Sequence, residues 1–92
     1  MHLEIVSPEA TLFSGEVDSV TVPGLNGEFQ VLINHAPIVS LLQQGIVKIG
    51  GEVIIEEEYE SKFKKNPDGK TTLPISSGTI EMNNNKVIVL VD

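Results

Sequence analysis

The 92-residue sequence contains no cysteine, no tryptophan and no arginine, and only 4% of its residues are aromatic. Without cysteine, a disulfide framework and a thiolate metal site are both excluded. Because aromatic residues are so few, valine, isoleucine and leucine must fill most of the core, and β-branched side chains favour pleated sheet. The composition therefore predicts one small domain, built mainly of strands.

Basic residues are also scarce, since six lysines stand against thirteen acidic residues and the formal net charge is −7. Binding to a nucleic-acid backbone needs a basic face, which this chain cannot assemble. No apolar run approaches the roughly 20 residues that span a bilayer, and the amino terminus lacks the layout of a signal peptide. We therefore expect a cytoplasmic protein with no nucleic-acid partner and no direct lipid insertion.

Short apolar segments alternate with turn residues along the whole chain. Strands are expected at Leu3–Val6, Thr11–Phe13, Glu16–Val22, Phe29–Ile33, Ile38–Leu42, Ile46–Ile49, Ile75–Met82 and Lys86–Val91. No helical periodicity is present, so the pattern predicts an all-β fold, an antiparallel β-sandwich of about 8–10 short strands in a single domain spanning residues 1–92. Five successive apolar residues within Lys86–Val91 predict a strand buried on both faces.

Three positions predict special backbone conformations. The apolar alternation slips within Glu16–Val22, and a bulge near Asp18 would restore it. Asn83–Asn85 predicts a hairpin turn, because asparagine accepts left-handed backbone angles better than most residues. Gly78, inside an otherwise apolar strand, indicates a bulge or the close approach of another backbone segment.

Residues 53–74 carry a separate charge pattern, in which four glutamates at positions 56, 57, 58 and 60 precede lysines 62, 64 and 65. Asn66–Gly69 is typical of a tight turn. We therefore expect a protruding charged hairpin, an insertion whose return strand is Lys70–Pro74. Exposed ion pairs across it would add only about 0.2–1 kcal/mol each.

Alternation in that hairpin would place Glu56, Glu58 and Glu60 on one strand face, like a row of cation ligands. Calcium loops, however, gather oxygen ligands on a tight loop with glycine at a set position, and that spacing is absent here. A solvated face is therefore the better interpretation, and no metal site is expected.

The stretch from Glu28 to Gly45 organises the chain. Two apolar runs flank the corner Asn34–Pro37, where proline fixes its own backbone and pushes the preceding residue into an extended conformation. His35 has no nucleophile or orienting carboxylate in the neighbouring sequence, so a structural or interface role is expected rather than catalysis. Leu41 and Leu42 are either core residues or an apolar patch that a partner covers.

The same stretch carries a resemblance. Gly27-Glu28-Phe29, Asn34-His35-Ala36-Pro37, Leu42 and Gly45-Ile46 are similar to the epsilon subunit family of the proton-driven ATP synthase, as are Leu3–Glu9, Leu12–Gly15, Ser77–Met82 and Val87–Leu90. These segments occur in order through most of the chain, and together they are far more specific than any one of them. The resemblance implies the β-sandwich domain of that family.

The resemblance also implies a function, that of a non-catalytic central-stalk subunit that joins the gamma subunit to the ring of c subunits and couples proton flow to ATP synthesis. Its partners would be gamma, the c ring and, transiently, the alpha/beta catalytic head, at the cytoplasmic side of a bacterial inner membrane. Carried over by position, the ring side matches Glu28 and His35, and the gamma side matches Ser7, Ser40, Leu41 and Leu42. Because the sequence ends at Asp92, we expect no C-terminal helical domain, no inhibition by such helices, no ATP site and no cofactor.

Two other functions stay open at this point. A free-standing β-sandwich could bind a small molecule as a monomer. A small hydrolase could use His35 as its base, and the substitution His35→Ala would then abolish its activity.

Overall fold

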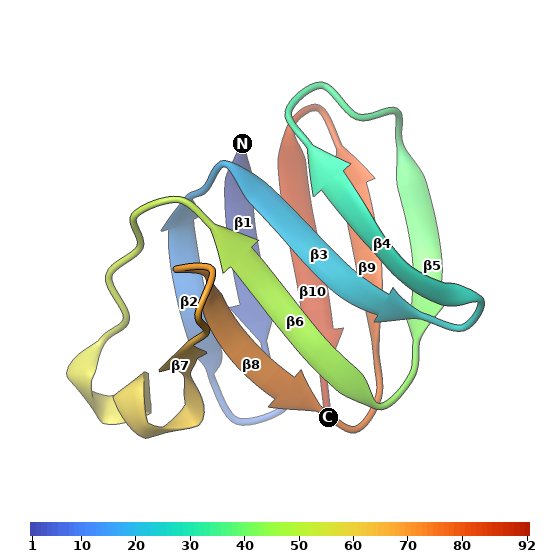
Figure 1. Ribbon diagram of the computed structural model, residues 1–92. Coiled ribbons are helices and arrows are strands. Elements are labelled where there is room, and N and C mark those ends of the chain that lie inside the picture. Colours follow the sequence, from blue (N-terminus) through green and yellow to red (C-terminus); the bar gives the residue numbers. More distant parts are fainter.

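The computed structural model describes residues 1–92 and is built almost entirely of strands, as expected (Figure 1). Its elements are β1 His2–Val6, β2 Thr11–Glu16, β3 Ser19–Gly24, β4 Gly27–Leu32, β5 Ile38–Leu42, β6 Gly45–Gly50, the 3-10 helix η1 Glu57–Lys62, β7 Lys64–Lys65, β8 Thr71–Ile75, β9 Gly78–Asn83 and β10 Lys86–Val91. The predicted all-β fold, with about 8–10 short strands, is confirmed.

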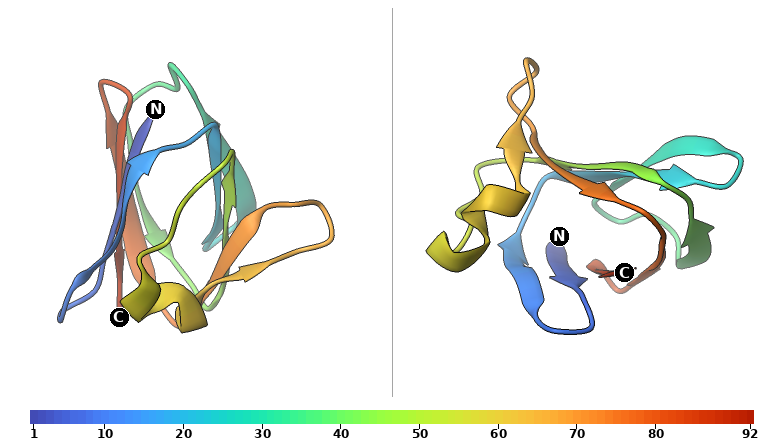
Figure 2. Two further views of the ribbon diagram at one scale, coloured as in Figure 1. Left: turned by 90° about the vertical axis from the view of Figure 1, so that its left-hand side faces the viewer. Right: turned by 90° about the horizontal axis from the view of Figure 1, so that it is seen from below.

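The ten strands form one continuous sheet that curls over itself into two layers (Figures 1 and 2). The back layer has the strand order β2-β1-β10-β9-β5, and the front layer has the order β4-β3-β6-β8-β7. A single pairing, Gly24 with Leu42, joins β3 to β5 and closes one side of the sandwich. The other side stays open between β2 and β8, and η1 lies beside this opening (Figure 2). All pairings are antiparallel except that of β1 with β10.

The core lies between the two layers and is filled mainly by aliphatic side chains, as the composition predicts. The side chains with almost no exposed surface are Leu3, Ile5, Val20, Val22, Val31, Val47, Ile49, Ile80, Met82, Val87 and Val89. They come from both layers and belong to one cluster of 19 buried residues. Interlocking of such side chains at the density of organic crystals makes the sandwich a rigid body.

The prediction that Lys86–Val91 is buried on both faces is wrong. Val87, Val89 and Val91 point into the core, whereas Ile88 is half-buried and Leu90 is 49% exposed. The reason is that β10 lies in the back layer, whose outer face no other layer covers. Apolar residues at the alternate positions of β10 therefore face outward.

The alternation slip near Asp18 comes from a change of layer and not from a bulge. The Val17 N–H donates to Met1 O at 2.9 Å, beside the back layer, whereas the Asp18 N–H donates to Gly50 O at 2.8 Å in the front layer. The chain therefore crosses between the layers at this step, and the faces that point inward change with it.

The structure confirms the two other backbone predictions. Asn84 and Asn85 have φ of 52° and 59°, the left-handed conformation expected for the turn between β9 and β10. Gly78 lies so close to the backbone of β10 that a Cβ atom would overlap the carbonyl oxygen of Leu90. Glycine is thus required by the approach of a neighbouring strand.

Residues 53–74 form a smaller hairpin than predicted. The acidic run lies in η1 rather than in a strand, and only Lys64–Lys65 pairs with β8. The tight turn is present, with Gly69 at φ 82°, but none of the glutamates forms an ion pair with the lysines of the hairpin. The helix allows Tyr59 to pack against the core while Phe63 is buried in it, so packing decides the local structure.

The strand predicted over Ile75–Met82 is divided by a turn at Ser76–Ser77.

Candidate functional site

The corner Asn34–Pro37 projects from one end of the sandwich, and all four of its residues are exposed. Asn34 has φ 64°, and its N–H donates to Oδ1 of Asn85 at 2.6 Å. In return, Nδ2 of Asn85 donates to Oδ1 of Asn34 at 2.9 Å. These two bonds join the corner to the turn between β9 and β10, 51 positions further along the chain.

His35 makes one side-chain contact, between its Nδ1 and the carbonyl oxygen of Ala36 at 2.6 Å. No serine, threonine or carboxylate lies within hydrogen-bond distance of its ring. A general base needs such a partner to activate a nucleophile. The geometry therefore gives no support to the hydrolase alternative, and His35 is an exposed side chain on a projecting corner.

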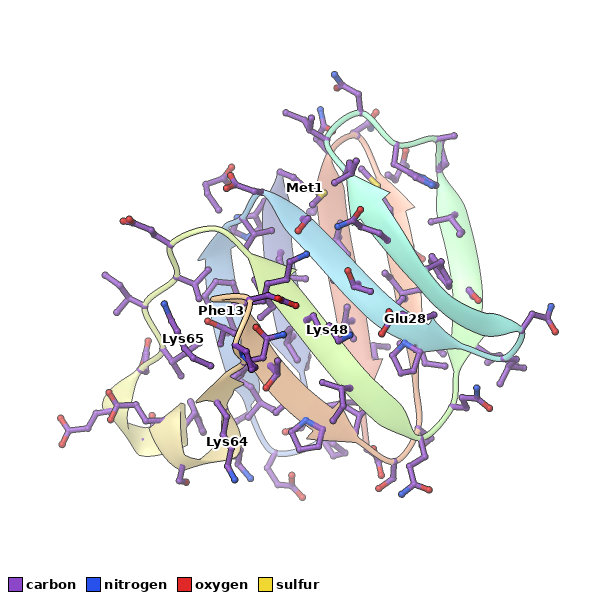
Figure 3. The ribbon with its side chains drawn as sticks, in the orientation of Figure 1. Met1, Phe13, Glu28, Lys48, Lys64 and Lys65 are labelled. Atoms are coloured by element: carbon purple, nitrogen blue, oxygen red, sulfur yellow. The ribbon has the colours of Figure 1, made fainter.

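Glu28 lies near the start of β4, and the corner follows the end of that strand. Four strand steps of about 3.3 Å separate Glu28 from Leu32, which precedes the corner. The structure therefore does not bring Glu28 and His35 together, although the resemblance assigns both to one partner. Glu28 instead pairs with Lys48 of β6, at 3.0 Å between Oε2 and Nζ (Figure 3).

The four residues assigned to the gamma side differ in their exposure. Leu42 is only 4% exposed and belongs to the core, while Leu41 is 60% exposed and faces outward. Ser40 is half-buried and donates to the carbonyl oxygen of Leu41 at 3.1 Å. Ser7 is half-buried, and its hydroxyl bonds within the turn that ends at Ala10. Of these four residues, only Leu41 therefore presents a large exposed side chain, whereas the Leu42 side chain is buried in the core.

The outer face of the back layer carries an apolar surface of which sequence reasoning had identified only Leu41. We name this surface the outer apolar face, and its residues are Val6, Val39, Leu41, Ile88 and Leu90. Val39 is 75% exposed, Leu41 60% and Leu90 49%. The strand register aligns Leu41, Thr79, Leu90 and Val6 in one row across four strands. Alternation along Ile38–Leu42 could have indicated it, because neighbouring strand residues point to opposite faces, and Val39 and Leu41 therefore share the face opposite to Leu42.

Polar residues lie among and beyond the apolar residues of this face. Its second row runs Val39, Glu81, Ile88 and Glu4, in which apolar and acidic side chains alternate. The row after it is polar and charged, with Asn83, Lys86 and His2. An apolar row with a polar border is the usual anatomy of a protein–protein interface.

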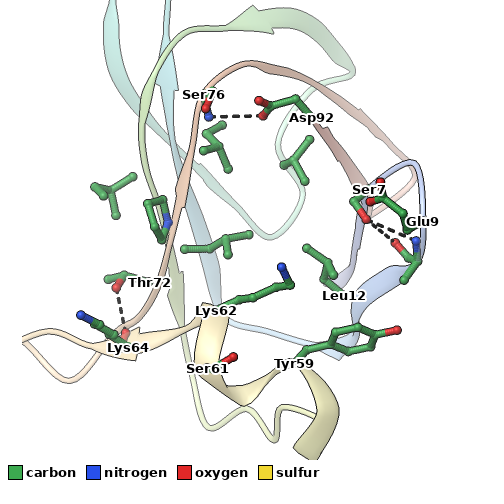
Figure 4. Close-up of a pocket in the computed structure, with 16 residues that line it drawn as sticks. Ser7, Glu9, Leu12, Tyr59, Ser61, Lys62, Lys64, Thr72, Ser76 and Asp92 are labelled. Carbon is green, nitrogen blue, oxygen red and sulfur yellow. Dashed lines mark hydrogen bonds between the residues drawn. The ribbon is translucent and has the colours of Figure 1, made fainter.

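A groove of about 790 Å³ occupies the open side of the sandwich (Figure 4). Leu12 of β2, Leu73 and Ile75 of β8 and Val91 of β10 form its apolar walls, and the Lys62 side chain extends into it. At one end, Asp92 Oδ1 accepts bonds from the N–H groups of Ser76 and Ser77. The bond from Ser77 is the main cause that lowers the pKa of Asp92 below 3.8.

A polar network on β1 and β2 involves the histidine that sequence reasoning set aside. His2 Nε2 lies 3.3 Å from Ser14 Oγ, and His2 Nδ1 lies 3.2 Å from Glu16 Oε2. The hydrogen bond from His2 lowers the pKa of Glu16, with a second contribution from the N-terminal amino group. The order of these groups resembles a hydrolase triad, but the two hydrogen bonds lie on the exposed outer face of β1 and β2, and none of the three residues lines the groove.

No three histidine, aspartate or glutamate side chains lie close enough together to hold a metal ion. None of the helical structure is long and apolar enough to cross a bilayer.

Comparison with known proteins identifies the family. The pattern described as the ATP synthase delta/epsilon chain beta-sandwich domain matches residues 1–92. The ATP synthase epsilon chain of Campylobacter concisus is 39% identical over 92 residues, which are 100% of this chain and 60% of that relative. The epsilon chain of Chlorobaculum tepidum is 38% identical over 90 residues, which are 98% of this chain and 86% of that relative.

Solved structures share the fold. One is the mitochondrial ATP synthase of Euglena gracilis, in a structure of its OSCP, F1 and c-ring parts, with a TM-score of 0.72 and 24% identity over 97% of this chain and 48% of that one. Another is the central stalk and c ring of the Tetrahymena thermophila mitochondrial enzyme, with a TM-score of 0.71 and 15% identity over 98% of this chain and 61% of that one. The chain spans about 60% of the length of the Campylobacter concisus relative. The match over its full length shows that the chain belongs to the ATP synthase delta/epsilon family, as an epsilon-type β-sandwich domain.

Proposed function

We propose that this chain is a non-catalytic central-stalk subunit that links the gamma subunit of ATP synthase to the c ring and transmits the rotation driven by proton flow. The observation that carries the proposal is the outer apolar face, a group of exposed apolar side chains on an otherwise acidic domain. Exposed apolar patches with a polar rim mark sites of protein–protein interaction. A rigid sandwich with such a face suits a spacer that must not deform under torque.

The gamma subunit is the partner that we assign to the outer apolar face. Leu41, which the resemblance places on the gamma side, lies in its central row beside Thr79 and Leu90. Glu4 and Glu81 lie in the adjacent row, so a matching partner surface has an apolar stripe with lysine or arginine along one side. Burial of Leu41 and Leu90 would supply most of the binding free energy, because packed apolar anchors dominate interfaces.

The c-ring contact is proposed on the resemblance alone, through Glu28 and His35. Glu28 lies near the start of β4 and His35 lies beyond the end of that strand, so they are two separate contacts and not one patch. A change of charge at each position tests them separately, since the substitution Glu28→Lys or His35→Glu weakens ring binding only if that residue meets the ring. Transient contact with the alpha/beta head, and a position at the cytoplasmic side of a bacterial inner membrane, complete this proposal.

Small-molecule binding is a second candidate, which the groove beside η1 favours. Its volume of about 790 Å³ lies within the range of small-molecule pockets, and its walls are partly apolar, as the walls of such pockets are. A thermal-unfolding screen against a ligand panel tests this function. A saturable rise in melting temperature that the substitution Ser61→Trp abolishes would support it, and a flat panel would reject it.

The stalk proposal is tested by titrating the purified chain into the gamma subunit of its own organism, in a calorimeter at moderate salt. We expect one-to-one association, and we expect no ATP hydrolysis from the chain alone. No detectable heat from a folded chain would contradict the proposal.

A further inference from the structure

Asn34 and Asn85 are joined on the surface by two reciprocal hydrogen bonds. A backbone N–H can only donate, so the Asn34 N–H requires Oδ1 of Asn85 to face it. That orientation leaves Nδ2 of Asn85 to donate to Oδ1 of Asn34. The two side chains therefore fit each other in one arrangement only.

Asn85 is itself held in place by the sheet. Its carbonyl oxygen accepts a bond from the N–H of His2 at 2.9 Å, which ties it to the start of β1. Its side chain is half-buried, and its φ of 59° fixes the direction in which the side chain leaves the turn. Asn85 thus connects the corner, which belongs to no strand, to the hydrogen-bonded sheet.

The corner needs such an anchor. Residues 33–37 belong to no strand, and the one backbone bond within the corner is that from the His35 N–H to Leu32 O at 3.1 Å. Ile33 is 61% exposed and Leu32 is 50% exposed, so little burial holds the segment. An unanchored segment of this kind loses conformational freedom when a partner binds it.

We propose that Asn85 is a positioning residue, which acts through Asn34 to hold His35 and the exposed Ile33 in the orientation that a partner meets. This inference rests on the proposed function, since the partner is the gamma–c-ring rotor. It adds to the candidate site a residue that lies 51 positions from Asn34 in sequence. Preorganisation lowers the ordering cost of binding, so Asn85 contributes to affinity without touching the partner.

The test uses two glycine substitutions, because glycine adopts the positive φ of this turn without strain. Asn85→Gly removes the reciprocal bonds. Asn84→Gly changes the neighbouring residue, whose φ is 52° and whose side chain makes no hydrogen bond. Amide hydrogen exchange at Asn34 and His35, and affinity for the detergent-solubilised gamma–c-ring complex, are measured for the wild type and both variants.

We expect Asn85→Gly to speed exchange at Asn34 and His35 at least tenfold and to weaken binding about tenfold, with Asn84→Gly unchanged in both. Asn85→Asp keeps an acceptor for the Asn34 N–H and should restore part of the affinity. Equal affinity of the two glycine variants would overturn the inference, as would weaker binding without faster exchange. Failure of the wild type to bind would instead overturn the proposed function, and this inference with it.

Discussion

Lys48 Nζ lies 3.0 Å from Glu28 Oε2, and the pair spans β3 on the outer face of the front layer (Figure 3). Lys48 pairs with Thr21 in the β3–β6 register, while Glu28 pairs with Pro23 on the other side of β3. The ion pair therefore lies over the middle of β3, and Thr21 beneath it is only 7% exposed. The Glu28 carboxylate is thus paired with Lys48 of the same domain and does not extend freely from the turn between β3 and β4.

The first prediction concerns the stability that this pair supplies. Both side chains are partly exposed, so their coupling in a double-mutant cycle of Glu28→Gln and Lys48→Gln should lie below about 1 kcal/mol. Urea unfolding of the four proteins at two salt concentrations measures it. A coupling above about 2 kcal/mol would mean that the pair is far less hydrated than its exposure indicates.

The second prediction concerns Gly78. A methyl group there would overlap the carbonyl oxygen of Leu90, and backbone atoms cannot move aside cheaply, so Gly78→Ala should cost about 3 kcal/mol of unfolding free energy. Gly15→Ala is the matched control, because the nearest atom to its Cβ is the ring end of Phe13 at 3.1 Å. That variant should lose no more than about 1 kcal/mol. Equal losses in urea unfolding would contradict the close approach of β9 and β10.

The third prediction contrasts two neighbouring leucines. Leu42 is buried, so Leu42→Ala should cost about 2–5 kcal/mol through lost burial and the cavity left behind. Leu41 is 60% exposed, so Leu41→Ala should change the free energy of unfolding by about 0.5 kcal/mol or less. A reversed order would show that the register of β5 is shifted by one residue.

The fourth prediction concerns acid stability. The hydrogen bond from His2 holds the pKa of Glu16 below its ordinary value of 4.5 in the folded state. The unfolded chain then binds a proton at Glu16 more readily, so the contribution of Glu16 is complete above pH 4.5 and is lost as pH falls through the folded pKa. Between about pH 6 and about pH 3, the wild type should lose more stability than Glu16→Gln. Glu52→Gln, an exposed control outside any ion pair, should follow the wild type.

The sequence predicts most of the architecture because most of the strands are short, rich in apolar residues and bounded by turn residues such as glycine, proline or asparagine. Where a strand is apolar on both of its faces, however, the sequence could not show which face points into the core. Ile88 and Leu90 are the clearest case, since their outward direction depends on the absence of a third layer. The 3-10 helix of the acidic run was also out of reach, because the packing of Tyr59 and Phe63 decides it.

The candidate site was predictable in part. Leu41 was found by resemblance, and its exposure agrees with an interface role, whereas Leu42 and Ser7 are occupied within the domain. Leu90 joins Leu41 only through the register of β5, β9 and β10, which no local pattern reveals, whereas alternation along β5 already places Val39 on the same face as Leu41. The Asn34–Asn85 contact is equally invisible in sequence, because its members lie 51 positions apart.

The central claim is that the outer apolar face binds the gamma subunit, and the most direct test compares two charge insertions in the same titration. Leu90→Glu places a carboxylate in the middle of that face, whereas Ile54→Glu does so at a 90% exposed position near η1. We expect the wild type and Ile54→Glu to bind gamma alike, and Leu90→Glu to lose at least about tenfold in affinity, or 1.4 kcal/mol. Equal binding by all three folded proteins, or equal loss in both variants, would contradict this claim.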